Sequence, residues 1–216
     1  MDYKAIIFDM DGVIFDSERA VLRCWQELSA RYGFARVEVP YMRCVGVNAA
    51  VSRQIFLDFY GADFPYDRYS GEVSRNYHAR YDGGRLPMKP GIRELLDALG
   101  QRNCPLALAS STRSATVTAQ LRDAGLLPCF RAVIGGDQVS HSKPHPEIFL
   151  TAAEQLGVAP GDCCVVEDSY NGIRAAHAGG MIPLMVPDTL PPDEEMHRLA
   201  RAIVPDLFAL RDLLCG

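Results

Sequence analysis

The sequence predicts a doubly wound α/β fold, in which a mostly parallel sheet is covered by helices on both faces and a helical segment is inserted after the first strand. Segments of helical length alternate with short apolar runs from about residue 88 onward, as expected for parallel strands joined by crossover helices. Runs of this kind, bounded by Gly, Pro or Asp, are typical of strands buried on both faces. They occupy residues 4–8, 105–109, 132–134, 163–166 and 182–186.

Three segments in the second half of the chain have the features of crossover helices. Residues 91–99 carry apolar side chains at helical spacing. Residues 115–124 precede Gly125, and glycine is typical just beyond a helix C-terminus. Residues 146–156 begin with proline, which suits a first helical turn, and they end before Gly157.

Residues 17–86 break the alternation of strands and helices. This interval is too long for a loop in a compact domain. It contains no convincing strand, and its helical patterns cover residues 19–32, 50–60 and 69–81. We therefore predict a core domain made of residues 1–16 and 87–216, with residues 17–86 forming an inserted helical cap domain.

Composition narrows the classes of partner. The net charge of −5 and the scattered Lys and Arg residues provide no basic surface for nucleic acid. No apolar run approaches the roughly 20 residues of a membrane span, so no membrane association is expected. The seven cysteines form no C-x-x-C pair, and no signal peptide is visible, which favours a reduced, cytoplasmic setting. Oligomeric state is not legible from these features.

Polar residues follow the predicted strands at their carboxyl ends, where ligands bind in open α/β sheets. The first apolar run ends abruptly in two carboxylates that are two residues apart. The other strands are followed by hydroxyls, a lysine and a further pair of carboxylates. These residues are Asp9 and Asp11, Ser110–Ser114, Ser142–Lys143, and Glu167–Asp168.

This set of residues predicts a site for an oxyanion and a metal ion, which is chemically suited to phosphoryl transfer. Several carboxylates repel one another unless a hard divalent cation lies among them, and oxygen ligands favour Mg²⁺. Ser110, backbone N–H groups and Lys143 are suited to hold a phosphate. A carboxylate that attacks phosphorus would give an aspartyl-phosphate, and Asp11 would be available to protonate the leaving oxygen and later to activate water.

The motifs resemble those of the haloacid dehalogenase (HAD) superfamily. The sequence DMDGVIFDS over residues 9–17 is followed by a hydroxyl after the second strand, then by Lys143-Pro144, then by EDSYNG over residues 167–172. The resemblance covers nearly the whole chain. It is greatest to the branch that contains β-phosphoglucomutase and sugar-phosphate phosphatases, and residues 17–86 resemble that branch's α-helical cap.

The resemblance implies roles for individual residues. Asp9 is expected to be the nucleophile and a Mg²⁺ ligand, and Asp11 the acid/base whose backbone carbonyl also binds Mg²⁺. Asp168 is expected to complete the metal site, with Glu167 in or just outside its inner ligand shell. Ser110, the Ser111 amide and Lys143 are expected to hold the phosphoryl group. The substrate-binding candidates are Arg113, Asn48 and Arg53, and further polar candidates are Arg43 and Lys89.

The expected activity is that of a phosphatase acting on a small phosphorylated metabolite, such as a sugar phosphate. Dehalogenases of this superfamily lack an aspartate at the Asp11 position, so Asp11 favours phosphoryl transfer. A β-phosphoglucomutase-type mutase is the alternative. Such mutases carry a histidine where Val21 stands here and an arginine after a G-V-S stretch, where this chain has GVNA over residues 46–49, with Arg53 the nearest candidate. A non-catalytic phosphate- or partner-binding module would be expected to lack Asp9 or Asp11, and both are present.

Two features allow a simpler interpretation. Asp16 either caps the first helix of the insert or lies on the substrate side, and the sequence does not decide between them. His141 and His145 flank Lys143, whose positive charge would disfavour a bound cation, so we interpret them as surface-loop histidines.

Overall fold

The computed structural model describes residues 2–45 and 49–216. The chain divides into two compact units. One, the core unit, consists of Met1–Asp16 and Pro87–Gly216, and the other, the helical unit, is Ser17–Leu86. Each unit is described by itself below.

The core unit is built on a six-stranded sheet in the order β3-β2-β1-β4-β5-β6, with every neighbouring pair parallel. The predicted doubly wound fold is confirmed. A sixth, two-residue strand at the edge is the addition that the apolar runs did not predict. The strands are β1 (Ala5–Phe8), β2 (Leu106–Ser110), β3 (Ala132–Gly135), β4 (Cys163–Glu167), β5 (Ile182–Met185) and β6 (Ala202–Ile203).

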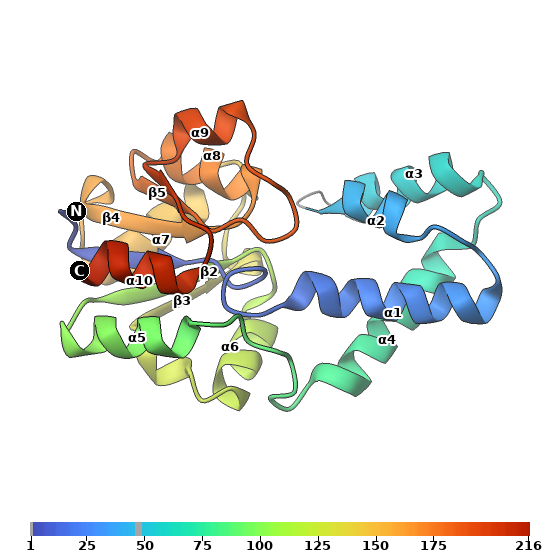
Figure 1. Cartoon of the computed structure of the whole chain (residues 1–216), viewed down its shortest axis with the longest axis horizontal. Helices are drawn as coiled ribbons and strands as arrows, with labels where there is room; N and C mark the ends of the chain where they lie inside the picture. Colours follow the sequence, from blue (N-terminus) through green and yellow to red (C-terminus); the bar gives the residue numbers. More distant parts are fainter. Residues whose placement is uncertain (1, 46–48) are drawn as a thin grey trace. The chain divides into compact units, whose positions relative to one another are not determined.

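Helices cover both faces of this sheet (Figure 1). The helices are α5 (Ile92–Gln101), α6 (Ser114–Asp123), α7 (Glu147–Leu156), α8 (Tyr170–Ala178), α9 (Glu194–Leu199) and α10 (Leu207–Cys215), with single 3₁₀ turns at Leu127–Cys129, Gly136–Gln138 and Pro160–Asp162. Right-handed crossovers place α5 and α6 on one face and α7 and α8 on the other, because the chain reverses its direction across the sheet after β3. α10 lies beside α5.

Complete burial of β1 explains its apolar sequence. All four of its residues are fully buried, and alternate side chains point to opposite faces. Ile7 packs against α7 in a cluster that includes Phe149, whereas Phe8 meets Phe130 edge to face with ring centroids 6.2 Å apart. The strand therefore delivers the next residue, Asp9, from a rigid position.

The strand order places the carboxyl ends of β1 and β4 at the switch point of the sheet. From β1 the chain moves outward to β2 and β3, and it then returns to β4 on the other side of β1. Phe8 pairs with Val166, so Asp9 and Glu167 follow from neighbouring strands at the same height. Ligands bind at this point in open α/β sheets because the loops there diverge.

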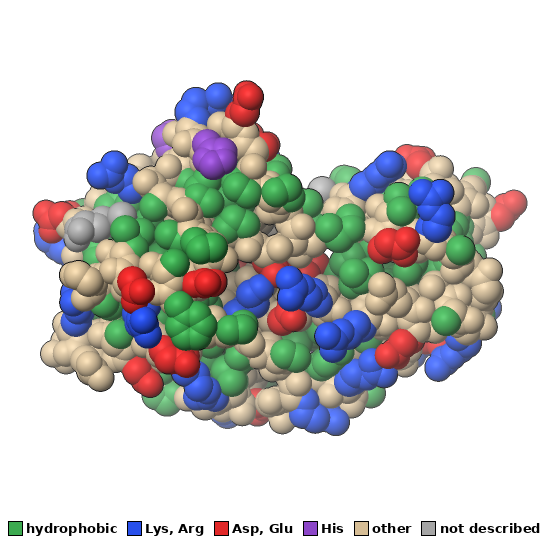
Figure 2. All heavy atoms as spheres, viewed as in Figure 1, with side chains coloured by type: hydrophobic (Ala, Val, Ile, Leu, Met, Phe, Trp, Pro, Cys, Tyr) green, Lys and Arg blue, Asp and Glu red, His purple; other side chains and the backbone are tan. Residues whose placement is uncertain are grey.

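The helical unit contains α1 (Ser17–Tyr32), α2 (Glu38–Cys44), α3 (Ala49–Tyr60) and α4 (Tyr66–Tyr81). Three of these match the predicted helical patterns, and α2 was not predicted. An aromatic cluster supplies much of the packing, since Phe34 contacts Tyr60, Phe64 and Tyr69 with ring centroids 5.2–5.4 Å apart. Within the described residues, no helix has the length and apolar content of a membrane span. Basic and acidic side chains are interspersed on the visible face of each unit (Figure 2).

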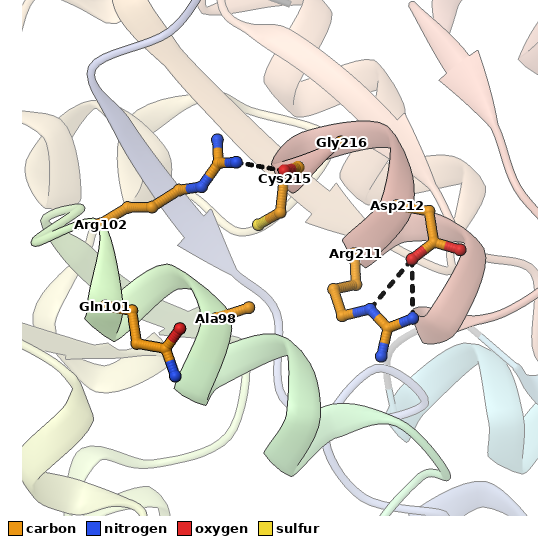
Figure 3. A pocket seen from close by; sticks show the side chains of 7 residues that line it. All are labelled: Ala98, Gln101, Arg102, Arg211, Asp212, Cys215 and Gly216. Carbon is orange, nitrogen blue, oxygen red and sulfur yellow. Dashed lines mark hydrogen bonds and ion pairs between the residues drawn. The ribbon is translucent and has the colours of Figure 1, made fainter.

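A pocket of about 400 Å³ lies between the C-terminal ends of α5 and α10 (Figure 3). Arg102 donates hydrogen bonds to the carbonyl oxygens of Leu214 and Cys215, which the end of α10 leaves without helical partners. Tyr3, just before β1, donates to the Leu214 carbonyl at 3.0 Å. The pocket therefore lies at the amino-terminal edge of the sheet, opposite the end that carries Asp9.

Candidate active site

Asp9 continues directly from β1, and the chain then turns sharply at Gly12. The Asp9 backbone N–H donates to the Val166 carbonyl at 2.9 Å, which ties the start of this turn to β4. Gly12 has φ +78°, and a Cβ there would lie 2.2 Å from an Asp168 carboxylate oxygen. Glycine is thus required at position 12 for two reasons: the backbone there is left-handed, and Asp168 approaches too closely for a side chain.

Lys143 joins the carboxylates of two neighbouring strand ends. Its Nζ lies 2.6 Å from Asp9 Oδ1 and 2.6 Å from Glu167 Oε1. The side chains of all three residues are at most 8 % exposed, so these are buried ion pairs. The ammonium also lies 4.7 Å from the centre of the Phe149 ring, close enough for a cation–π contact.

The pKa values of Asp9 and Lys143 are both raised, although burial acts on the two groups in opposite directions. Burial raises the pKa of Asp9 above its ordinary value, with Lys143 opposing the rise and Glu167 and Asp11 adding to it. Burial alone would lower the pKa of Lys143, but the two carboxylates raise it above its usual range. Lys143 is therefore a permanent cation at neutral pH. The carboxylates outnumber the single lysine, so this site attracts a further cation.

Glu167 ends β4 and organises the loop that follows. Its Oε2 accepts hydrogen bonds from the backbone N–H groups of Asp168 and Ser169 and from the Ser169 hydroxyl, at 2.9–3.0 Å. A Cβ at Gly172 would lie 1.9 Å from the Glu167 carboxyl group. The EDSYNG segment thus needs glycine at its last position because Glu167 occupies the space of a side chain there.

Asp11 is held by two hydroxyl groups from the end of β2. Thr112 Oγ1 donates to Asp11 Oδ2 at 3.0 Å, and Ser110 Oγ donates to the same oxygen at 3.3 Å. Ser110 is fully buried, and its Oγ also accepts from the Thr112 backbone N–H at 3.1 Å. These contacts fix the side chain of Asp11 beside the predicted phosphate-binding loop.

The donor set at this edge of the sheet fits a hard divalent cation. Asp9, Glu167 and Asp168 are each buried and each place a carboxylate oxygen within 4.8 Å of the others. An all-oxygen set with excess negative charge is what Mg²⁺ prefers. Three of the four predicted ligands, Asp9, Glu167 and Asp168, are therefore close enough to share an ion, although both oxygens of Glu167 already bind protein groups.

The predicted substrate contacts belong to both units of the chain. Ser111 and Arg113 lie exposed on the loop after β2. Lys89 is engaged by Asp188 after β5, with Nζ and Oδ1 2.5 Å apart, and Arg53 lies in the helical unit with Nε 3.2 Å from Asp67. Asn48 lies outside the described residues. Roles for these residues in substrate binding remain predictions.

The structure also places Asp16 and Arg43, whose roles the sequence left open. It shows two further contacts, made by Thr112 and Phe149, that the sequence did not predict. Asp16 directly precedes α1, and its backbone N–H donates to the Pro87 carbonyl at 2.8 Å. Arg43 is in the last turn of α2. Thr112 contacts Asp11 and was grouped only with a run of hydroxyls, while Phe149 contacts Lys143 from a segment that was predicted only as a crossover helix. The available signal for Thr112 was its hydroxyl, two residues beyond Ser110 in the loop after β2.

Comparison with known proteins agrees with the geometry. The chain matches the model of the haloacid dehalogenase-like hydrolase family over residues 3–180. The chain belongs to this family. It is therefore a hydrolase of the phosphatase type, as the motifs predicted.

Several of the proteins that this chain resembles are named for phosphorylated sugars. The chain is 32% identical over 178 residues to a phosphorylated carbohydrates phosphatase from Thermotoga maritima, covering 82% of each chain. It is 31% identical over 196 residues to a beta-phosphoglucomutase from Bacillus subtilis, covering 85% of this chain and 83% of the relative. A structure of a CbbY variant from Rhodobacter sphaeroides in complex with xylulose 1,5-bisphosphate is similar, with a TM-score of 0.74, 25% identity and 95% of each chain covered.

Proposed function

We propose that this HAD-like hydrolase is a Mg²⁺-dependent phosphatase of a small sugar phosphate and that it acts through an aspartyl-phosphate on Asp9. The observation that carries the proposal is the buried ion pair between Asp9 and Lys143 beside the hydroxyl-bound Asp11. A nucleophile and an acid/base are thereby supplied from the end of β1, and a cation for the transferred group comes from the segment that follows β3. The phosphorylated-carbohydrate phosphatase among the relatives supports the class of substrate.

In the first step, a carboxylate oxygen of Asp9 attacks phosphorus in line with the ester bond. Lys143 binds Oδ1, so we assign the attack to Oδ2. As the new O–P bond forms, the bond from phosphorus to the sugar oxygen breaks and its electron pair stays on that oxygen. Asp11 donates its proton to the leaving oxygen, which departs as an alcohol.

In the second step, Asp11 accepts a proton from water, and the resulting hydroxide attacks phosphorus. The bond between phosphorus and Asp9 breaks, so inorganic phosphate leaves and Asp9 returns to a carboxylate. The hydroxyls of Ser110 and Thr112 keep Asp11 oriented for both proton transfers. Lys143 stays charged throughout because its pKa is raised, and it offsets charge on the phosphoryl oxygens.

The metal would be held by Asp9 and Asp168, with Glu167 beside them and the predicted Asp11 carbonyl. When bound, Mg²⁺ supplies positive charge that offsets the negative charge of the phosphoryl group and the carboxylates. Gly12 gives Asp168 the space to approach this position.

A phosphosugar mutase is the second candidate, favoured by the similarity to a beta-phosphoglucomutase. A mutase must hold a second phosphate, for which an arginine in the helical unit would serve. Arg53 is the nearest candidate, and Asp67 engages its Nε at 3.2 Å. Because its charge is partly offset there, we prefer hydrolysis.

The test is Mg²⁺-dependent release of inorganic phosphate from p-nitrophenyl phosphate, followed by a panel of hexose and pentose phosphates. Wild-type protein is expected to release phosphate, and Asp9→Asn is expected to release none. No release by the wild type, or full activity of Asp9→Asn, would contradict the proposal. Conversion of β-glucose 1-phosphate to glucose 6-phosphate without release of phosphate would instead establish the mutase.

A further inference from the structure

A second group of potential metal ligands lies outside the active site, on the loop that carries Lys143. His141, His145 and Glu147 each place one ligand atom within 4.8 Å of the others. The two imidazole rings lie 4.5 Å apart between centroids and are tilted by 34°. The rings are exposed at the surface, so an ion from solvent reaches them without any movement of the core.

The charge argument against a cation here does not hold in the structure. Lys143 separates the two histidines in sequence, but its side chain is only 8 % exposed and its Nζ is 2.6 Å from Asp9 and from Glu167. The ammonium therefore points into the core, where two carboxylates offset its charge. His141 and His145 are left facing Glu147 instead.

The carboxylate of Glu147 is fixed in place before any ion binds. Oε1 accepts from the Ser140 backbone N–H at 2.8 Å, and Oε2 accepts from the His141 backbone N–H at 2.9 Å. The Ser140 hydrogen bond, followed by that of the His141 side chain, holds the pKa of Glu147 below its ordinary value. An ionised, oriented carboxylate is thus available at neutral pH.

The distances suit the spacing of ligands around zinc. Bonds of about 2.0–2.1 Å in a tetrahedral site place neighbouring ligand atoms about 3.3 Å apart. Here Oε2 of Glu147 lies 2.7 Å from His141 Nδ1 and 3.9 Å from His145 Nδ1, so the observed distances bracket that value. His145 Nδ1 accepts from the Glu147 backbone N–H at 3.3 Å, which holds the ring beside Glu147, and an ion bound at Nδ1 would replace this hydrogen bond.

We propose that His141, His145 and Glu147 bind a zinc-class divalent cation, at a site separate from the carboxylates around Asp9. Imidazole nitrogen with one carboxylate oxygen favours Zn²⁺ over Mg²⁺, whereas the all-oxygen cluster around Asp9 has the opposite preference. A bound ion would tie the loop over residues 141–145 to the first turn of α7. It would replace the hydrogen bond between His141 and Glu147 and release its proton.

The experiment measures zinc stoichiometry on the full chain in excess Mg²⁺, by titration against a chromophoric zinc chelator. Zinc that enters the Asp9 cluster binds all variants alike, so the difference between variants isolates the new site. The double variant His141→Ala/His145→Ala is expected to bind one equivalent fewer than the wild type. His177→Ala removes an exposed histidine on α8 and is the matched control, expected to bind as the wild type does.

A second measurement does not depend on any variant. On addition of zinc to the wild type, the imidazole NMR signals of two of the five histidines are expected to shift, and those two are assigned as the signals missing from the double variant. Equal zinc stoichiometry in the wild type and the double variant would overturn the proposal. So would zinc-dependent shifts confined to the other three histidines.

Discussion

Replacing Lys143 by methionine tests whether its ion pairs at the strand ends stabilise the folded protein. Methionine keeps most of the side-chain volume but removes the charge that lies 2.6 Å from both Asp9 and Glu167. The two carboxylates then remain buried without their lysine. Removing one partner of a buried ion pair costs about 3–5 kcal/mol, because the other charge stays desolvated and unpaired.

For a chain of 216 residues, each kcal/mol lowers the thermal midpoint by about 2–4 °C. At about 3 kcal/mol, the Lys143→Met variant in a chelator at neutral pH is therefore expected to melt about 6–12 °C below the wild type. Saturating Mg²⁺ should recover part of this loss, because it provides positive charge beside the same carboxylates. Phosphatase turnover should stay reduced by about 10²–10³-fold, the usual effect of losing one electrostatic contact to a reacting group.

Lys4→Met is the matched control. Lys4 Nζ pairs with Asp162 at 2.8 Å, but this lysine side chain is 70 % exposed, and such surface pairs contribute little. Circular dichroism melts of both variants, with and without Mg²⁺, provide the comparison. Equal melting of the two variants in chelator would refute the claim that Lys143 offsets buried charge.

Three further predictions concern individual residues. Gly12→Ala should abolish measurable phosphatase activity and weaken Mg²⁺ binding, because the new Cβ would lie 2.2 Å from an Asp168 oxygen. The control is Gly33→Ala, which has a similar φ of +74° but lies in open space. It should lose only about 1–2 kcal/mol of stability to left-handed backbone strain and keep full activity. Thr112→Val should lower kcat about tenfold, because the acid/base carboxylate of Asp11 loses the hydroxyl that orients it. Thr112→Ser keeps a hydroxyl and should keep the wild-type kcat. Equal rates in the two variants would rule out this positioning role. In chelator, burial raises the pKa of Asp9 above its unfolded value of about 4, so the folded state binds more protons than the unfolded state above that pH. The thermal midpoint should therefore fall as pH rises above about 5, and Asp9→Asn should flatten that slope in calorimetric scans; an unchanged slope would contradict the shift.

The sequence was most informative where chemistry and strand ends coincide. Asp9, Lys143, Glu167 and Asp168 were predicted to meet because parallel strands end at one edge of a sheet, and the structure places their side chains together. Phe149 was not recognisable, since a phenylalanine at a helical core position looks the same whether or not a lysine lies over its ring.

The sequence did not predict the shortest secondary-structure elements or the directions in which side chains point. α2 spans seven residues and β6 spans two, too few to show a hydrophobic period, and tertiary contacts determine both. The interpretation of His141 and His145 assumed that the charge of Lys143 lies between them. Sequence proximity did not reveal that the lysine side chain turns inward while the two imidazoles remain outside.

The most direct test of the account is identification of the phosphorylated residue. Wild-type protein with Mg²⁺ is mixed with an excess of p-nitrophenyl phosphate, quenched in acid within a single turnover, digested and mapped by tandem mass spectrometry. The account predicts one added phosphoryl group on Asp9, absent from the Asp9→Asn variant. A phosphoryl group on another residue, or steady turnover by Asp9→Asn, would contradict it.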